Sequence, residues 1–196
     1  MSGNKERGCL FCRTGKEVEV VQRFSMSFPD CRAIVPTRTR IRRSADAVQE
    51  DNVPLLPGYV FFEMDESQCV SGDDSDKPDA AEPDNRGQTP ADAVLQRFVR
   101  ENGVLKLLRY TDGDWRLHGS DDLFAEMLLR TGGNINVSQA YYDEGNRIRI
   151  LSGFLKDYEG CITRVNRKTR TAEIHVDFHG KNVTMWLGYE LLEAVK

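Results

Sequence analysis

The stretch Leu55–Met64 reads LLPGYVFFEM and carries the clearest structural signal in the N-terminal half of the chain. Pro57-Gly58 is a turn signal, and the aromatic and β-branched residues behind it predict a buried strand. Upstream, the runs Cys9–Arg13 and Ala33–Val35 predict two further strands, with a helix at Lys16–Met26 between them. The N-terminal order is therefore strand, helix, strand, strand.

Downstream of this stretch the sequence predicts two more helices and one strand. Thr89-Pro90 is a helix start, because Thr caps and Pro tolerates the first position, and Gly103 ends that helix. Val104–Tyr110 can form a strand, and a third helix runs from Ser120 to the glycine pair at 132–133. Apolar residues at helical spacing define the inward faces of the three helices: Val18, Val21 and Phe24 or Ser25; Val94, Leu95, Phe98 and Val99; Leu123, Phe124, Met127 and Leu128. Helices mixed with strands in this order indicate an α+β sandwich, one antiparallel sheet covered by helices.

The C-terminal fifty residues have a different period. Apolar residues alternate with polar ones along Arg147–Ile150, Ala172–Phe178 and Val183–Leu187, and turn residues at 152–153, 167–169 and 179–180 separate four or five short strands. This pattern predicts a small antiparallel β-barrel at 144–196. The periodicity fades at 134–143, which is expected to be a linker to an N-terminal domain at 8–133.

The acidic residues are concentrated in one segment. The chain has 196 residues and a formal charge of -4, from 27 Lys+Arg and 31 Asp+Glu. Asp65–Asp92 holds 9 acidic residues against Lys77 and Arg86, a net of -7, so the remainder of the chain carries +3. Residues 65–90 are predicted to be a disordered acidic insertion. It is either a solvated spacer or an arm that competes with nucleic acid for a basic surface.

Composition also indicates a cellular location. No apolar run reaches the length of a membrane span, and Met1–Arg7 lacks the apolar core of a signal peptide. The five cysteines have no framework spacing, which favours reduced thiols. We therefore expect a soluble cytoplasmic protein that does not contact a membrane.

Catalytic and metal-binding motifs are weak. Cys9 and Cys12 with His175 and His179 imitate a two-Cys two-His zinc set, but residues three apart on a strand point to opposite faces. There is no phosphate-binding glycine loop and no nucleophile elbow. The sequence therefore predicts no catalytic residues, no metal and no cofactor, and a protein that is not an enzyme.

Two basic clusters are candidate nucleic-acid contacts. Arg38, Arg40, Arg42 and Arg43 follow one another without an acidic residue, and guanidinium groups pair well with phosphate oxygens. Arg164, Arg167, Lys168 and Arg170 lie at a predicted hairpin tip of the barrel, which could follow a phosphate backbone. The alternative for each cluster is a solvated, solubilising surface.

Three aromatic residues allow two interpretations. Tyr59 and Phe61 are two apart and share one face of a strand, and Phe11 lies in the first predicted strand. They either belong to the core under a helix or form an apolar docking pocket. Periodicity alone favours the core.

Pro54–Phe62, preceded by a helix and followed by a linker and a terminal barrel, resembles the NusG family of transcription elongation factors. Gly145–Ile150, Ser152-Gly153 and Tyr158–Ile162 resemble its KOW motif. Within the family, Leu10–Glu17 looks most like the specialised LoaP antiterminators, which act on selected long operons. The resemblance covers Gly8–Lys196 except the acidic insertion. It implies an NGN-like N-terminal domain and an SH3-like KOW barrel.

The resemblance also implies partners. In the family the N-terminal domain docks an apolar pocket onto the clamp helices of RNA polymerase beside DNA, and Phe11, Tyr59 and Phe61 match pocket positions. The segment Arg38–Arg43 would then lie near nucleic acid. The family's barrel contacts a ribosomal protein, another factor or RNA, and the cationic hairpin suits nascent RNA. Two positions depart from the family pattern: Arg7-Gly8 replaces a Trp-Tyr pair, and His179 replaces an aromatic residue.

These observations predict a monomeric transcription elongation and processive antitermination factor that binds RNA polymerase and suppresses pausing and termination, with RNA contacted by the KOW domain. The alternative is a ribosome-associated or general RNA-binding KOW protein that has no polymerase contact.

Overall fold

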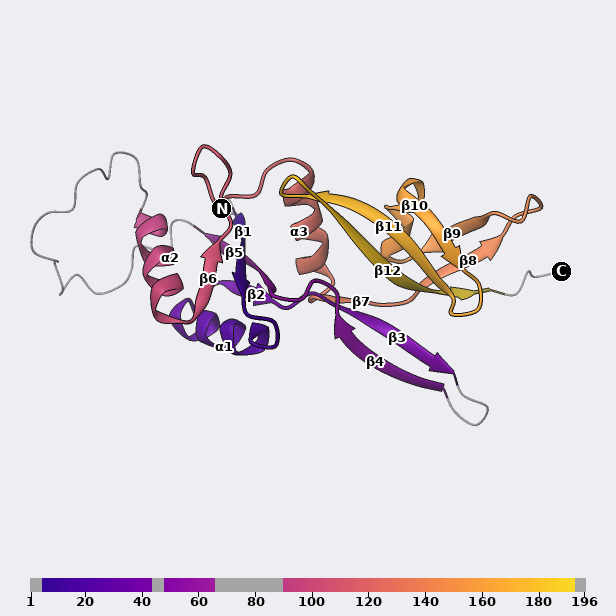
Figure 1. Cartoon of the computed structure of the whole chain (residues 1–196), viewed down its shortest axis with the longest axis horizontal. Helices are drawn as coiled ribbons and strands as arrows, with labels where there is room; N and C mark the ends of the chain where they lie inside the picture. Colours follow the sequence, from indigo (N-terminus) through magenta and orange to yellow (C-terminus); the bar gives the residue numbers. More distant parts are fainter. Residues whose placement is uncertain (1–4, 44–47, 66–89, 193–196) are drawn as a thin grey trace, which may run out of the picture. The chain divides into compact units, whose positions relative to one another are not determined.

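The computed structural model describes the backbone of residues 5–43, 48–65 and 90–192 (Figure 1). The predicted acidic insertion at 65–90 therefore lies outside the described residues, apart from its two end positions. The chain divides into two compact units: Met1–Val35 with Pro57–His118, and Pro36–Leu56 with Gly119–Lys196.

The first unit is a four-stranded antiparallel sheet with two helices (Figure 1). The sheet has the order β2-β5-β1-β6. Its elements are β1 (Lys5–Cys12), α1 (Glu17–Ser27), β2 (Arg32–Ile34), β5 (Tyr59–Asp65), α2 (Pro90–Glu101) and β6 (Val104–Leu107). The strands and helices predicted for this part of the chain are confirmed to within a few residues.

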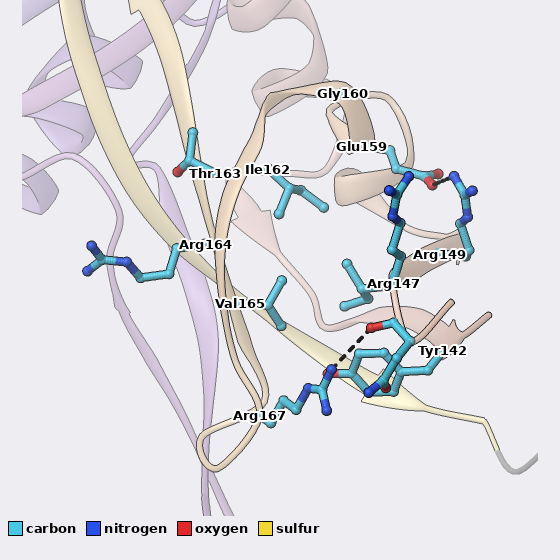
Figure 2. A pocket seen from close by; sticks show the side chains of 12 residues that line it. Tyr142, Arg147, Arg149, Glu159, Gly160, Ile162, Thr163, Arg164, Val165 and Arg167 are labelled. Atoms are coloured by element: carbon cyan, nitrogen blue, oxygen red, sulfur yellow. Dashed lines mark hydrogen bonds and ion pairs between the residues drawn. The ribbon is translucent and has the colours of Figure 1, made fainter. Parts of the chain in front are cut away.

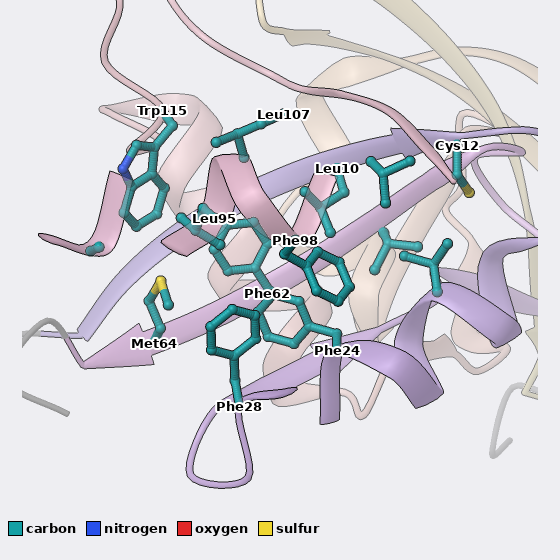
Figure 3. Close-up of a cluster of buried hydrophobic side chains, with 14 residues drawn as sticks. Leu10, Cys12, Phe24, Phe28, Phe62, Met64, Leu95, Phe98, Leu107 and Trp115 are labelled. Carbon is teal, nitrogen blue, oxygen red and sulfur yellow. The ribbon is translucent and has the colours of Figure 1, made fainter. Parts of the chain in front are cut away.

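One face of this sheet and both helices enclose a hydrophobic core. Alternate residues of β1 and β5, among them Leu10 and Phe62, point to this face, where the rings of Phe24 and Phe98 from the two helices meet them (Figure 3). Gly8, the second of the two positions where the family pattern has a Trp-Tyr pair, also faces the core. A Cβ at Gly8 would lie 2.3 Å from the Phe62 ring and 2.8 Å from that of Trp115. The indole of Trp115 stacks on Phe62 and thus occupies the space above this glycine.

The inward faces of the helices were predicted in part correctly. Phe24, Leu95 and Phe98 are buried. Val18 was expected to face inward but is 62% exposed, because α1 turns Val20 toward the sheet instead. The prediction was also wrong for Leu123 of the third helix, which is 61% exposed. In both helices the apolar stripe is displaced by one or two residues from the spacing that was expected.

The second unit contains an arginine-rich hairpin that the sequence did not predict as strands. β3 (Thr37–Arg43) and β4 (Val48–Pro54) pair antiparallel in continuous register from Thr37 opposite Pro54 to Arg43 opposite Val48. β7 (Asn134–Ile135) pairs parallel with the start of β3. The segment Arg38–Arg43, expected as a basic extension of the strand before it, is therefore one arm of this hairpin.

The C-terminal part of this unit is a curled five-stranded sheet with the order β10-β11-β12-β8-β9 (Figure 1). Its elements are β8 (Ser138–Tyr142), β9 (Ile148–Ser152), β10 (Ile162–Asn166), β11 (Thr171–Phe178) and β12 (Lys181–Leu191), with short 3-10 turns at Phe154–Lys156 and Glu159–Cys161. The expectation of a fully antiparallel arrangement was wrong, because β12 pairs parallel with β8.

The segment predicted as a linker, 134–143, is structured here. It forms β7 and β8, and β8 is the strand between β12 and β9 in the C-terminal sheet. Its sequence SQAYY has too few apolar positions to show the alternation of a half-buried strand. The domain limits at 133 and 144 are tested by no comparison and stay a prediction.

Helix α3 (Ser120–Arg130) packs on the end of β11. The rings of Phe124 and Phe178 lie 5.6 Å apart, and the backbone N–H of His179 donates a hydrogen bond to the Asp121 carboxylate at 3.1 Å. His179 and Gly180 both have positive φ, as the two-residue turn between β11 and β12 requires. This turn is the one that the sequence predicted.

The predicted fold class is confirmed: the protein is α+β, with an antiparallel sheet covered by helices and a curled C-terminal sheet of short strands. In the part of the chain that the structure describes, no helix is both long and apolar enough to cross a membrane.

Candidate functional site

Two of the three predicted docking aromatics lie side by side on the face of the first sheet opposite the core. Phe11 of β1 pairs with Tyr59 of β5, and their rings meet edge to face with centroids 5.0 Å apart. Both side chains are partly exposed. The ammonium group of Lys106, which pairs with Phe11 from β6, lies 5.8 Å from the Phe11 ring centroid. This group of three residues, the Phe11–Tyr59 face, combines apolar surface with one cation.

Phe61 points to the same side of the sheet but is fully buried. β5 is an inner strand, so Phe61 has Cys9 of β1 on one side and Ile34 of β2 on the other. Only Phe11 and Tyr59 of the three predicted residues therefore present accessible surface. Burial also raises the pKa of the Tyr59 phenol above its ordinary value.

The arginines of β3 alternate with Thr and Ile, so Arg38, Arg40 and Arg42 share one face of the hairpin. Asp51 of β4 forms ion pairs with Arg40 at 3.4 Å and with Arg42 at 3.0 Å. Arg38 makes no ion pair with any described residue. Burial and the charge of Arg40 lower the pKa of Arg38 below its ordinary value. The side chain of Arg43, the fourth predicted contact, lies outside the described residues.

Arg170 lies beside these hairpin arginines. A groove of about 370 Å³ between β3 and β12, the β3–β12 groove, is lined by Arg38, Thr39, Arg40, Ile41, Arg42, Val137, Thr169, Arg170, Thr171, Trp186, Gly188 and Tyr189. Residues from both predicted basic clusters therefore line a single groove.

The other predicted arginines of the C-terminal sheet lie at a second, larger cavity of about 650 Å³, the β9–β10 cavity (Figure 2). It is lined by Tyr142, Asn146, Arg147, Ile148, Arg149, Glu159, Gly160, Ile162, Thr163, Arg164, Val165 and Arg167. The lining of this cavity contains four arginines and one glutamate, so its net charge is positive.

Two carboxylates form ion pairs with one arginine of the cavity lining. The guanidinium of Arg149 pairs with Asp143 at 2.9 Å and with Glu159 at 3.6 Å. These contacts raise the pKa of Arg149, with the Asp143 hydrogen bond as the largest cause. The pKa of Asp143 is lowered, first by the backbone N–H of Arg147 and then by Arg149. Arg149 is thus held in place, whereas the Arg147 side chain makes no ion pair with a described residue.

The aromatic ring of Tyr142 contacts Arg167, another arginine of the cavity lining. The Arg167 guanidinium lies 4.6 Å from the ring centroid of Tyr142 and donates to the backbone carbonyl of Asn146 at 3.1 Å (Figure 2). The hydroxyl groups of Tyr142 and Tyr189 lie 2.8 Å apart, and Tyr189 is buried. These contacts hold the Arg167 guanidinium against the Tyr142 ring.

The remaining members of the second basic cluster diverge. In Figure 2 the Arg164 side chain extends from β10 away from Arg147 and Arg149. Lys168 is exposed at the tip of the β10–β11 hairpin.

Sequence reasoning missed Arg147, Arg149, Tyr142 and Trp186 as candidates. The alternation Arg147-Ile148-Arg149-Ile150 marked one exposed, cationic strand face and could have identified the first two.

The described residues contain no group of three or more His, Cys, Asp or Glu side chains placed to hold a metal ion. Cys9 and Cys12 are both buried in β1, where Cys12 belongs to the core and Cys9 lies on the opposite face beside Phe61. Burial raises the pKa of both thiols, so they stay protonated.

The arginine-lined cavities have the charge to bind a polyanion. The guanidinium groups that line the β9–β10 cavity and the β3–β12 groove can contact successive phosphates. The rings of Tyr142 and Trp186 offer surfaces on which bases stack. The Phe11–Tyr59 face, by contrast, has the composition of a protein-docking surface, with an apolar centre and a cation beside it.

A family model and a curated relative that match this chain carry the same name. A family model described as "Transcription termination factor nusG" matches residues 9–77. A curated relative, the transcription termination/antitermination protein NusG of Borreliella burgdorferi, is 19% identical over 170 residues, which cover 85% of this chain and 80% of the relative. A structure solved to study domain interaction in Thermotoga maritima NusG is 16% identical and covers 94% of each chain, with a TM-score of 0.47.

Proposed function

We propose that this protein, whose resemblance to the NusG family of transcription termination/antitermination factors the comparisons confirm, is a specialised processive antitermination factor that acts at selected operons. The observation that carries the proposal is the pairing of a NusG-family segment at 9–77 with a cationic, tyrosine-backed cavity on the C-terminal sheet. The first part would bind RNA polymerase and the second would bind RNA. The proposed role is that of a binding protein and includes no catalytic step.

The Phe11–Tyr59 face supports the polymerase contact. The two rings lie on strands of a sheet whose other face is a packed core, so the surface is held rigidly. A rigid aromatic pair loses little conformational entropy on docking, and such residues often carry much of an interface's binding energy. We propose that this face docks onto the clamp helices of the polymerase.

The β9–β10 cavity supports the RNA contact. Arg147 makes no ion pair with a described residue, and Arg167 is positioned by Tyr142, so both could bind phosphate oxygens without breaking an existing ion pair. Arg149 is already neutralised by Asp143 and Glu159 and would contribute less. RNA binding here should weaken steeply with salt, because phosphate contacts release counterions.

A clamp-bound factor would act by shifting an equilibrium. If the factor binds the closed, elongating polymerase more tightly than the opened, paused state, it favours elongation by its difference in affinity for the two states. RNA bound at the C-terminal sheet would keep the factor on a chosen transcript, since a second contact raises the effective concentration of the first.

The test is transcription past an intrinsic terminator with purified polymerase, with and without the full-length protein. We expect increased run-through that Tyr59→Ala reduces at least fivefold, because the variant removes one of the two accessible rings. Met26→Ala is the matched control: Met26 is an apolar residue on α1 that is 80% exposed and lies outside the Phe11–Tyr59 face. No run-through with the wild-type protein, combined with co-purification of ribosomal proteins in place of polymerase, would support the ribosome-associated alternative.

A further inference from the structure

The β3–β12 groove brings together two strands that are about 140–150 residues apart in sequence. β3 lies against β12 at Gly188, where a Cβ would meet the Thr39 carbonyl oxygen at 3.6 Å and Val137 at 3.4 Å. These are ordinary van der Waals distances, so the arginine hairpin packs in direct contact with the C-terminal sheet at this point. Both elements belong to the same compact unit, so the groove is a feature of that unit alone.

The groove has an unusual balance of charge. Its lining includes four arginines, Arg38, Arg40, Arg42 and Arg170, and no acidic side chain. Asp51 reaches Arg40 and Arg42 from β4. Neither Arg38 nor Arg170 forms an ion pair with any described residue. Like charges held together at a partly buried wall are unfavourable unless an anion joins them.

A hydrogen-bond donor of the groove is also left without an acceptor. The Nε atom of Arg40 is buried and donates to no residue in the described part of the chain. A buried polar group of this kind destabilises the fold unless a ligand or water satisfies it. A phosphate in the groove would supply the negative charge that this wall lacks.

Trp186 decides which kind of anion fits. It stands on the outer face of β12, partly exposed, and lines the groove beside the arginines. An indole ring next to guanidinium groups suits a flat base attached to a phosphate. Bases in a duplex are stacked on each other and cannot offer a face to the ring, so the groove suits an unpaired nucleotide. Its volume lies in the range typical of small-ligand pockets.

We propose that the β3–β12 groove binds an unpaired nucleotide of a single-stranded nucleic acid, with its phosphate held by Arg38, Arg40 and Arg170 and its base stacked on Trp186. The inference rests on the proposed function for the source of that strand, which would be the nascent transcript. It adds a second nucleic-acid site, separate from the β9–β10 cavity, and it makes the arginine hairpin part of RNA recognition.

The experiment measures binding of full-length protein to three fluorescein-labelled probes by anisotropy: a 12-nucleotide oligo(U) RNA, a 12-nucleotide oligo(dT) DNA and a 12-base-pair RNA duplex. We expect the wild-type protein to bind oligo(U) at least tenfold more tightly than the duplex. Trp186→Ala should weaken oligo(U) binding about 5- to 150-fold, the effect of losing one stacking platform. The double variant Arg38→Ala/Arg170→Ala should weaken it at least tenfold and reduce the salt dependence.

Two further variants serve as controls. Arg130→Ala removes one cation from the exposed end of α3 and should leave oligo(U) affinity unchanged. Trp186→Phe keeps a ring and guards against a folding defect in the alanine variant. Tryptophan emission provides a second readout, because the other tryptophan, Trp115, is fully buried in the first unit. Oligo(U) should quench the emission of the wild-type protein and not that of Trp186→Phe.

The outcomes separate this proposal from the proposed function. Unchanged oligo(U) affinity in both groove variants, or equal affinity of the wild-type protein for duplex and oligo(U), would overturn the groove assignment. Loss of RNA binding in Arg147→Ala/Arg149→Ala alone would overturn it too, while supporting the proposed RNA contact. Groove-dependent oligo(U) binding without terminator run-through would leave the groove assigned and refute antitermination. Tight oligo(dT) binding would support the groove and indicate that it also accepts displaced DNA.

Discussion

Glu17 and Gly58 show how single residues set the geometry of the docking face. Glu17 is buried, and its carboxylate accepts hydrogen bonds from the backbone N–H groups of Gly15 and Gly58, each at 2.7 Å. The carbonyl oxygen of Gly58 in turn accepts from the N–H of Cys12 at 2.8 Å. The start of α1, the end of β1 and the turn before Tyr59 are therefore fixed by one side chain and one glycine.

Substitution of Gly58 by alanine should both destabilise the protein and disturb Phe11. Gly58 has φ of +86°, and an added Cβ would lie 2.9 Å from the Cys12 carbonyl oxygen and 2.9 Å from Cε2 of Phe11. Gly113, with φ of +89° and nothing within 4 Å, is the matched control. We expect Gly113→Ala to cost about 1–2 kcal/mol from the left-handed backbone alone. Gly58→Ala should cost about 1–3 kcal/mol more, from the steric clash.

Denaturant unfolding of the two alanine variants measures this difference. The functional readout is polymerase binding, which Gly58→Ala should weaken and Gly113→Ala should not, since only the first displaces Phe11. Equal loss of unfolding free energy in the two variants would show that the turn can relax. The close approach at Gly58 would then not position the docking face.

At the scale of elements, the hairpin β3–β4 explains why part of the fold could not be predicted. Thr37–Arg43 alternates Thr or Ile with Arg, and a strand whose polar face carries guanidinium groups has little of the apolar periodicity that identifies strands. Its partner Val48–Pro54 is mostly polar. The helices α1 and α2 and the strand β5 were predictable because each has a dense apolar face, buried in one core.

Helix α3 illustrates a second kind of limit, because its sequence predicts a helix but not the surface that it covers. Phe124 and Ala125 are buried, whereas Leu123 is exposed. The contact between Phe124 and Phe178 joins the helix to β11 within the second unit. An amphipathic pattern gives the direction of a face only to within a residue or two, and it carries no information about the partner.

The packing of α3 on β11 can be tested by substitution. Phe124→Ala should lower the free energy of unfolding by about 3–5 kcal/mol, since a buried ring is removed. Leu123→Ala, on the same helix turn but 61% exposed, should change it by less than about 0.5 kcal/mol. A double-mutant cycle with Phe178→Ala should give a coupling energy of about 0.5–3 kcal/mol. Additive effects of Phe124→Ala and Phe178→Ala would refute a direct contact.

At the scale of the whole molecule, the sequence located both basic clusters but could not tell how they are used. The net charge of -4 argues against nucleic acid only until the acidic residues of 65–92 are separated from the rest. Arg170 and Arg38 are brought together by packing of β3 against β12, two strands of different sheets that are far apart in sequence, and no local pattern encodes that proximity. Trp186 was missed for the same reason, since its role depends on what lies opposite it.

The position of β8 gives a prediction about how the chain divides. β8 lies between β12 and β9, pairing parallel with Tyr189–Leu191 and antiparallel with β9. The hydroxyl oxygen of Ser138 accepts a hydrogen bond from the buried N–H of Leu155 at 3.1 Å. A fragment starting at residue 144 lacks this strand, so β9 would lose its connection to the sheet and Leu155 its acceptor. A fragment starting at 134 keeps both.

We therefore expect a fragment of residues 134–196 to fold and one of residues 144–196 to remain unfolded, as judged by amide dispersion in a proton–nitrogen correlation spectrum. A third fragment, 119–196, should melt at a higher temperature than 134–196, because it retains α3 on Phe178. A folded 144–196 fragment would show that β8 is dispensable and would favour a domain boundary at 143. A folded 134–196 fragment that still binds the duplex RNA probe would assign that binding to the β9–β10 cavity, since the fragment has no β3 and hence no β3–β12 groove.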